Sequence, residues 1–155
     1  MSAVLRPSLA VMLLCAGLAL AGCERAGEAA WEGERPPEPA APVVLAGVDL
    51  GQPVRALGTE PFWGVDIADG ALTLTGVDRP EQRFAAGAPE LVGTTAVWRG
   101  EAADGTAATL TLIATECSDG MSDRVYPLTA RFEAGETELA GCAEATARLM
   151  EGPGA

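Results

Sequence analysis

The residues best suited to chemistry in this chain gather at positions 116–126, which read Glu-Cys-Ser-Asp-Gly-Met-Ser-Asp-Arg-Val-Tyr. Paired carboxylates can hydrolyse glycosides as general acid and base, and carboxylates at alternating positions can hold calcium. The acids here fall at positions 116, 119 and 123, which does not match a calcium loop, so we expect no metal. Ser118 and Asp119 are expected to hydrogen-bond to the nearby backbone and to shape a turn.

A second candidate group lies upstream at residues 58–64, which read Gly-Thr-Glu-Pro-Phe-Trp-Gly. One interpretation is a binding rim, in which Phe62 and Trp63 supply contact area and Glu60 selects a cation or a hydrogen-bond donor. The other interpretation is structural: the two aromatic side chains plug one end of the fold, and Glu60 caps a turn. The candidate binding residues are therefore Glu60, Phe62, Trp63, Asp119, Asp123 and Tyr126.

The composition excludes several classes of function. The chain has no histidine, so Ser-His-Asp catalysis, Cys-His catalysis, histidine metal ligands and a histidine pH switch are all absent. The net charge of −12 argues against nucleic acid as a partner, because phosphates need a basic surface. It allows attraction to a basic protein, or it serves solubility alone. We expect no enzyme activity and no cofactor; a hydrolase that uses carboxylates alone is the remaining enzymatic hypothesis.

The amino terminus has the pattern of an export signal. Residues 9–20 form an uncharged apolar run that is too short to span a bilayer as a helix but suits a signal peptide. The Leu-Ala-Gly-Cys sequence at positions 20–23 closely resembles the lipobox of bacterial lipoproteins. That resemblance implies cleavage after residue 22 and lipidation of Cys23; the alternative is an ordinary signal peptide with an incidental cysteine. Because residue 24 is Glu rather than Asp, we expect an outer-membrane lipoprotein that faces the periplasm.

A tether is expected to follow the lipidated residue. Residues 24–42 hold five Glu, four Pro and a single large apolar residue, Trp31. Such a composition cannot bury enough apolar surface to offset the entropy of ordering. We therefore expect a disordered tether over residues 23–42 and a folded domain over residues 43–155.

The four cysteines can be assigned in the light of this leader. Cys15 lies in the signal peptide and Cys23 takes the lipid, which leaves Cys117 and Cys142 as an even pair in an oxidising compartment. We predict a disulfide between them. A two-cysteine metal site and a redox pair are the alternatives, but neither a histidine nor a Cys-x-x-Cys motif accompanies them. The bridge would tie the loop that enters one strand to the end of the partner strand in the same hairpin.

Short runs of alternating apolar and polar residues dominate the chain from residue 54 onward, which is the period of half-buried strands. Gly and Asp turns, such as Asp69-Gly70, separate these runs. Their spacing predicts an all-β fold, a small antiparallel barrel or sandwich of seven or eight short strands. A meander closes the sheet edges with the shortest connections, which favours the barrel. Expected details are a turn at residues 78–81, a short strand at 82–85, a short helix over residues 143–150, and one inward face shared by Tyr126, Leu128, Ala130 and Phe132.

Three motifs together resemble an uncharacterised family of bacterial envelope lipoproteins. They are the G-x-E-P-F-W run at residues 58–63, the C-x-D-x-M-S run at 117–122 and the Gly-Cys pair at 141–142. The resemblance spans about residues 54–143 and implies a lipid-anchored, barrel-like domain with no established activity. It is also loosely similar to the membrane-bound inhibitors of c-type lysozyme, which are small disulfide-bonded β-barrels. The Ser-Gly-x-x-Tyr type of loop that those inhibitors insert into lysozyme does not occur in this sequence.

Two classes of function are compatible with these observations. The first is a non-enzymatic binding module on the cell envelope, which presents its acidic barrel to a ligand or a basic protein. The second is a structural or stress-related envelope lipoprotein without a specific ligand. Inhibition of a lytic enzyme such as lysozyme is a special case of the first class.

Overall fold

The computed structural model describes residues 41–151. The predicted signal peptide, the predicted lipidation site Cys23 and most of the predicted tether lie outside the described residues. In the part that is described, eight strands close into an antiparallel barrel and the chain ends in one short helix. The prediction of an all-β barrel with a short C-terminal helix is therefore confirmed. Among residues 41–151 there is no helix that is long and apolar enough to cross a membrane.

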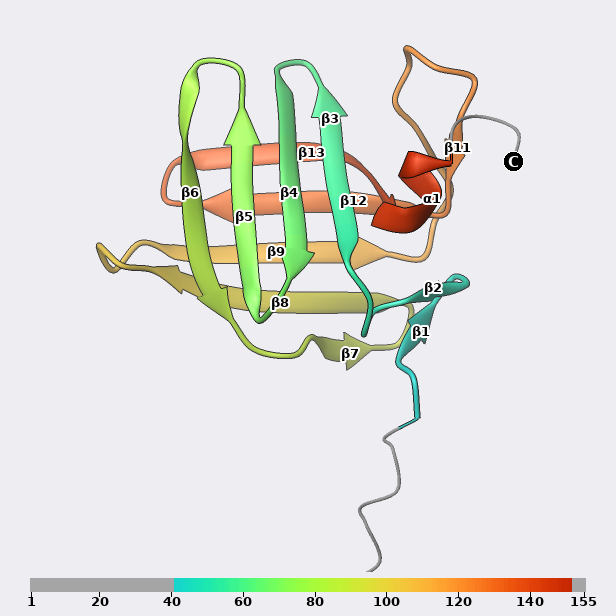
Figure 1. Ribbon diagram of the computed structural model, residues 1–155, viewed down its shortest axis with the longest axis horizontal. Helices are drawn as coiled ribbons and strands as arrows, with labels where there is room; N and C mark the ends of the chain where they lie inside the picture. Colours follow the sequence, from blue (N-terminus) through green and yellow to red (C-terminus); the bar gives the residue numbers. More distant parts are fainter. Residues whose placement is uncertain (1–40, 152–155) are drawn as a thin grey trace, which may run out of the picture. The chain divides into compact units, whose positions relative to one another are not determined.

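The barrel is a meander, in which each strand pairs with the next barrel strand along the chain. The last strand returns to the first, and β6 pairs with β8, so the sheet closes on itself. Figure 1 shows β3 to β6 lying across the other four strands. The barrel strands are β3 (Val54–Thr59), β4 (Phe62–Ala68), β5 (Ala71–Gly76), β6 (Arg79–Ala86), β8 (Thr95–Ala102), β9 (Ala107–Ile113), β12 (Leu128–Ala134) and β13 (Thr137–Ala145).

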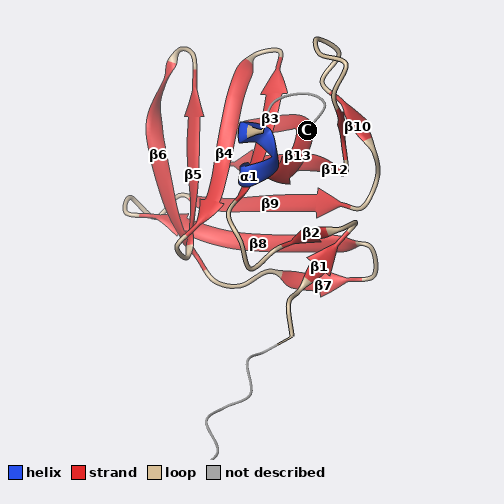
Figure 2. Ribbon diagram, turned by 45° about the vertical axis from the view of Figure 1, so that its right-hand side comes forward, coloured by secondary structure: helices blue, strands red, loops and turns tan. Residues whose placement is uncertain are grey.

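Several shorter elements lie outside the eight barrel strands (Figure 2). The first hairpin, β1 (Val44–Leu45) with β2 (Val48–Asp49), precedes the barrel strands. The edge strand β7 (Glu90–Val92) pairs with the first half of β8. Between β9 and β12 the chain inserts the hairpin of β10 (Cys117–Ser118) and β11 (Val125–Tyr126), which we call the insert. Helix α1 (Thr146–Met150) follows β13.

Alternation along the strands places apolar side chains inside the barrel. In β4, for example, Trp63, Val65 and Ile67 are buried, as their period of two predicts. Inward side chains from all eight barrel strands belong to one buried cluster, in which the rings of Phe84 and Phe132 meet edge to face at 5.7 Å. An eight-stranded barrel is just wide enough for side chains to fill it, so this interior is a packed core.

The amino-terminal hairpin covers one end of the barrel. Leu45, Val48 and Leu50 are buried and belong to the core cluster, and the Leu50 amide donates to the Val43 carbonyl oxygen at 2.8 Å. Farther along, the Pro53 carbonyl oxygen accepts from the Thr146 amide at 2.9 Å, which joins this segment to the start of α1. The core is therefore closed by chain that precedes the first barrel strand.

Two of the expected boundaries are wrong. The turn expected at residues 78–81 involves only Val77 and Asp78, because a positive φ of 50° at Asp78 makes the reversal tight. Strand β6 therefore starts at Arg79 rather than near residue 82. Pro80 is tolerated there because the β5–β6 register is irregular between Leu74 and Gly76, and proline is compatible with such bulges.

The carboxyl-terminal helix is also shorter than expected. Residues 143–145 have helix-favouring types, yet they extend β13 and pair with β3. That pairing closes the barrel, and tertiary pairing of this kind outweighs the weak local helix propensity. Helix α1 therefore starts only at Thr146.

Candidate functional site

The three motifs that lie far apart in the sequence meet on the surface of the barrel. They line a shallow hollow of about 410 Å³, which we call the motif hollow. Its walls come from the end of β3, from the insert and from the outer side of β13. The residues that line it are Leu57, Gly58, Thr59, Glu60, Ser118, Asp119, Gly120, Met121, Ala140, Gly141 and Cys142.

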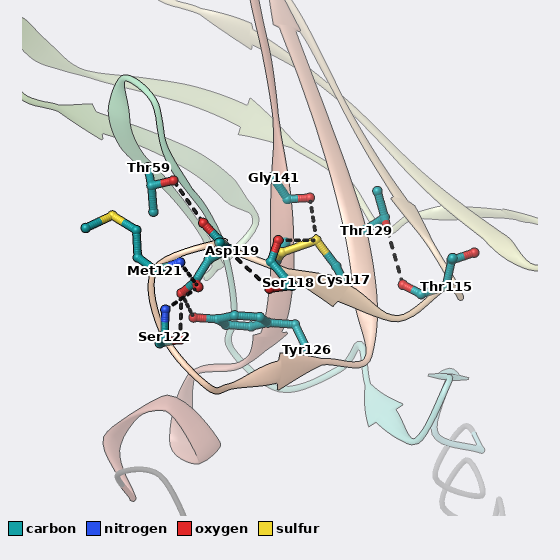
Figure 3. Close-up of a disulfide and its surroundings, with 12 residues drawn as sticks. Thr59, Thr115, Cys117, Ser118, Asp119, Met121, Ser122, Tyr126, Thr129 and Gly141 are labelled. Carbon is teal, nitrogen blue, oxygen red and sulfur yellow. Dashed lines mark hydrogen bonds between the residues drawn. A yellow bond between two sulfur atoms is a disulfide. The ribbon is translucent and has the colours of Figure 1, made fainter.

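A disulfide holds one wall of the motif hollow. Cys117 in β10 is bonded to Cys142 in β13 (Figure 3), with Cα atoms 5.5 Å apart, a separation common in disulfides. The predicted pairing is confirmed. Cys142 is buried but does not belong to the main core cluster. Successive residues of a strand face opposite sides of the sheet, so Cys142 faces away from the side on which Gly141 and Ala143 lie. The insert is thereby fastened to the outer face of the barrel.

Asp119 organises the loop of the insert. Its Oδ1 accepts hydrogen bonds from the amides of Met121 at 3.0 Å and Ser122 at 2.8 Å. Its Oδ2 accepts from the Ser122 hydroxyl at 2.8 Å and from the Tyr126 hydroxyl at 2.9 Å (Figure 3). The Ser118 hydroxyl oxygen likewise accepts from the Gly120 amide at 3.2 Å. The expected local hydrogen bonds of Ser118 and Asp119 are therefore confirmed.

These hydrogen bonds set the protonation of Asp119. The Ser122 and Met121 amides hold the pKa of the carboxyl well below its usual range, because they bond to the charged form. The carboxylate is thus ionised, and both of its oxygens are engaged by groups of its own loop. It shapes the motif hollow and has little capacity left for a ligand.

Tyr126 is placed differently from the prediction. It is buried, but it does not belong to the core cluster that contains Leu128, Ala130 and Phe132. Pro127 separates it from β12, and Tyr126 pairs with Cys117 in the insert instead. Burial and the bond to the Asp119 carboxylate raise the pKa of its hydroxyl. Tyr126 is therefore a support beneath the loop and not a surface contact.

Trp63 is likewise a buried support. It is 5% exposed and lies in the core cluster, directly opposite Gly58 in the β3–β4 ladder. A methyl group on Gly58 would overlap the indole Nε1, and one on Gly141 would stand 3.0 Å from the indole ring and overlap the Leu57 carbonyl oxygen. The glycines of two motifs thus allow the ring to lie against the backbone. The structural interpretation therefore describes Trp63 better than the binding-rim interpretation.

The groups left accessible at this site are apolar and acidic. Phe62 is 53% exposed and Met121 is 69% exposed, while Glu60 and Asp123 are also exposed. Phe62 lies opposite Thr59 in the β3–β4 ladder, and the Thr59 hydroxyl donates to the Asp119 carbonyl oxygen at 3.1 Å. Figure 3 shows Met121 on the same side of the loop as Thr59. Glu60 and Asp119 are the charged residues that line the hollow, and no arginine lines it.

A second anchor holds the insert, and sequence reasoning missed it. Arg124 contacts Glu144 in β13 at 3.4 Å and the Arg148 carbonyl oxygen of α1 at 3.2 Å. The Arg124 and Glu144 side chains are only 17% and 11% exposed. No local sequence pattern predicts a contact between Arg124 and Glu144, which are 20 residues apart. The one available signal was that Arg124 is the single arginine in an acidic loop, which suggests an acidic partner. Over residues 41–151, no group of three acidic or cysteine side chains is arranged to hold a metal ion.

Comparisons with protein-family models, with curated proteins and with solved structures find nothing that matches this chain. The resemblance to envelope lipoproteins and to lysozyme inhibitors therefore stays a prediction.

Proposed function

We propose that this chain is a lipid-anchored protein of the bacterial cell envelope, which binds a partner through the surface around the motif hollow. Its partner is a basic protein, and it has no catalytic activity of its own. The observation that carries this proposal is the pair of exposed apolar side chains, Phe62 and Met121, next to a hollow whose charged lining residues are both acidic. Exposed aromatic and thioether groups are enriched where proteins bind one another.

The rigidity of the support favours the same proposal. The disulfide, the hydrogen bonds of Asp119 and the contacts of Arg124 hold the loop that carries Met121. Buried Trp63 fixes the hairpin that carries Phe62. A surface that is ordered before binding loses less entropy when a partner docks. The filled barrel interior argues against a small ligand inside the barrel, so binding is proposed at the outer surface.

Site-specific photo-crosslinking in living cells tests the proposal. A photoreactive phenylalanine analogue is placed at Phe62 or at Met121, and as a control at Ala107, which is exposed on β9 away from the hollow. We expect positions 62 and 121 to crosslink to the same basic protein, and position 107 not to do so. The double variant Glu60→Lys/Asp123→Lys should abolish the crosslink, because it reverses the charges that attract the partner.

Two results would count against this assignment. One is the absence of any crosslink from positions 62 and 121 in correctly folded, exported protein. The other is a crosslink that survives the double charge reversal.

Lipidation is tested separately: mass spectrometry of the exported protein should find acylated Cys23, and Cys23→Ser should release the protein from the membrane fraction.

The alternative is a structural envelope lipoprotein without a specific partner. The saturated hydrogen bonds of Asp119 favour it, because every acceptor of that carboxylate serves the fold. It predicts that a deletion strain becomes sensitive to detergent and that the Phe62→Ala/Met121→Ala protein restores resistance in full. A lysozyme assay separates the inhibitor case, since an inhibitor protects cells at micromolar protein and a structural lipoprotein does not.

A further inference from the structure

A second hollow lies at the end of the barrel that the amino-terminal segment covers. Its volume is about 550 Å³, which is within the usual range for small-molecule sites. Its walls are residues 41–43 and 50–53, the β4–β5 turn and the loop between β6 and β7. Trp98 of β8 also lines it. We call it the end pocket; it shares no lining residue with the motif hollow.

The end pocket has a clear origin in the sequence. Strand β6 stops pairing with β8 at Ala86, and pairing with β8 resumes only at Glu90 of β7. Pro89 has no amide hydrogen to donate to the ladder, so a continuous strand is not available there. The wall of the barrel is therefore interrupted at residues 87–89, which line the end pocket. Leu50, Ile67 and Trp98, which form its inner wall, are at most 7% exposed.

The lining of the end pocket is mostly apolar, with few polar groups. Aliphatic side chains of Val43, Leu50 and Ile67 line it together with the indole of Trp98. The polar side chains in its lining are Gln52 and Asp69, and Asp69 is the one charged residue among them. An apolar lining with a few polar groups suits a ligand with an apolar body and a polar end. A negatively charged end would be repelled by Asp69, whereas a hydroxyl or amide could hydrogen-bond to it.

We propose that the end pocket binds the alkyl chain of a neutral amphiphile, with its uncharged polar end near Asp69. This inference goes beyond the proposed function and is independent of it. The alkyl chain lies against Trp98 and the aliphatic residues, and the pocket discriminates against fatty-acid carboxylates.

The test uses the full chain with Cys23→Ser, so that no lipid of its own competes. The probes are undecanol and undecanoate, each with a terminal bromine that quenches tryptophan fluorescence on contact. We expect saturable quenching by the bromo-alcohol and weaker binding of the bromo-carboxylate. Asp69→Asn removes the repelling charge and keeps the turn, because Asn-Gly suits the positive φ values of 50° and 69° at residues 69 and 70. It should strengthen carboxylate binding about two- to fivefold and leave alcohol binding unchanged.

Two neighbouring valines provide a matched pair of variants. Val43 lines the end pocket and Val44 does not, yet both are exposed. Val43→Asp should weaken binding of the bromo-alcohol, and Val44→Asp should not. Quenching that rises linearly with probe concentration, or an equal effect of the two valine variants, would overturn the proposal. Equal binding of alcohol and carboxylate to the unaltered pocket would overturn the preference for a neutral end. Because Asp69→Asn preserves the turn, the charge test stands even if Val43→Asp fails to fold.

Discussion

At the scale of single residues, most side chains of the motifs stabilise the loop and the hairpin, and only a few are exposed to solvent. Asp119, Tyr126 and Trp63 attracted functional interpretations because they are charged or aromatic. In the structure, one has all its acceptors occupied and the other two are buried. The exposed residues at the site are the acidic Glu60 and Asp123 together with Phe62 and Met121, and the side chains of Phe62 and Met121 carry no obvious chemistry.

The buried hydroxyl of Tyr126 makes a testable prediction. It is the one tyrosine of the chain, so the ultraviolet absorbance of phenolate reports on it alone. Its pKa is raised by burial and by the Asp119 carboxylate, so it should titrate above the ordinary value of about 10. Asp119→Asn should bring the pKa back toward that value, and Asp123→Asn, which changes an exposed carboxylate of the same loop, should not. A Tyr126 titration that is identical in all three proteins would contradict the hydrogen bond.

The sign of the pH dependence follows from these pKa directions. A raised pKa in the fold gives Tyr126 a stabilising contribution that is fully present below about pH 10 and is lost as the pH rises through the folded pKa. Asp119, whose pKa is lowered, contributes above its unfolded value of about 3.9 and loses that contribution as the pH falls through its folded pKa. Urea unfolding of the Asp119→Asn protein should therefore show a smaller loss of stability on acidification than the unaltered protein shows.

The close packing at Gly141, a glycine of the third motif, makes a further prediction. Gly141→Ala should lower the free energy of unfolding by about 1–3 kcal/mol, because the added methyl group overlaps the Leu57 carbonyl oxygen. Gly87→Ala is the matched control, since a methyl group there meets nothing within 4 Å. Urea denaturation measures both. An equal effect of the two substitutions would show that the close approach of Trp63 and the backbone at Gly141 is not a constraint.

At the scale of elements, the insert is a separate layer fastened to a complete barrel. The eight barrel strands pair without it. The disulfide and the Arg124–Glu144 contact hold it against β13, and α1 joins that network through Arg148. Such an arrangement allows the insert to loosen before the barrel unfolds.

Removal of the disulfide tests this layering. Cys117→Ala/Cys142→Ala opens a loop with a sequence separation of 25 residues, which should cost about 3.5 kcal/mol of stability in the chain-entropy model. Amide hydrogen exchange should accelerate first in the insert, at Met121 and Ser122, while the amides of β4 and β9 stay protected. Loss of protection in all these strands at once would mean that the insert and the barrel unfold as a single unit.

At the scale of the whole molecule, the chain carries a net charge of −12. One pair even opposes stability: Glu133 and Glu138 lie directly opposite each other in the β12–β13 ladder, and both are exposed. Like charges in such positions are destabilising. Acidic residues that cost stability are consistent with the proposed attraction to a basic partner.

Glu138→Lys tests that cost. It should raise the free energy of unfolding by about 0.2–1 kcal/mol, because it replaces a repulsive cross-strand pair with an attractive one. Glu136→Lys, in the turn of the same hairpin, makes the same change of net charge without a cross-strand partner and should have a smaller effect. The difference between the two variants should shrink as salt is added, since exposed charges are screened. A difference that persists at high salt would point to packing rather than charge.

The sequence by itself determined those strands and turns that depend only on residues adjacent in the chain. A period of two in side-chain polarity sets strands with one buried face, and Asp69-Gly70 sets a tight turn; both follow from the backbone geometry of a few adjacent residues. The spacing of these runs predicted the number of barrel strands and the meander. The Cys117–Cys142 pairing was predicted because the leader accounts for the other two cysteines, Cys15 and Cys23. Only the tertiary structure decided which residues meet across the barrel. Trp63 lies over glycines from two motifs, Arg124 of the insert contacts Glu144 of β13, and residues 143–145 close the sheet instead of forming a helix. Those outcomes depend on contacts between segments far apart in the chain, and no local pattern carries them.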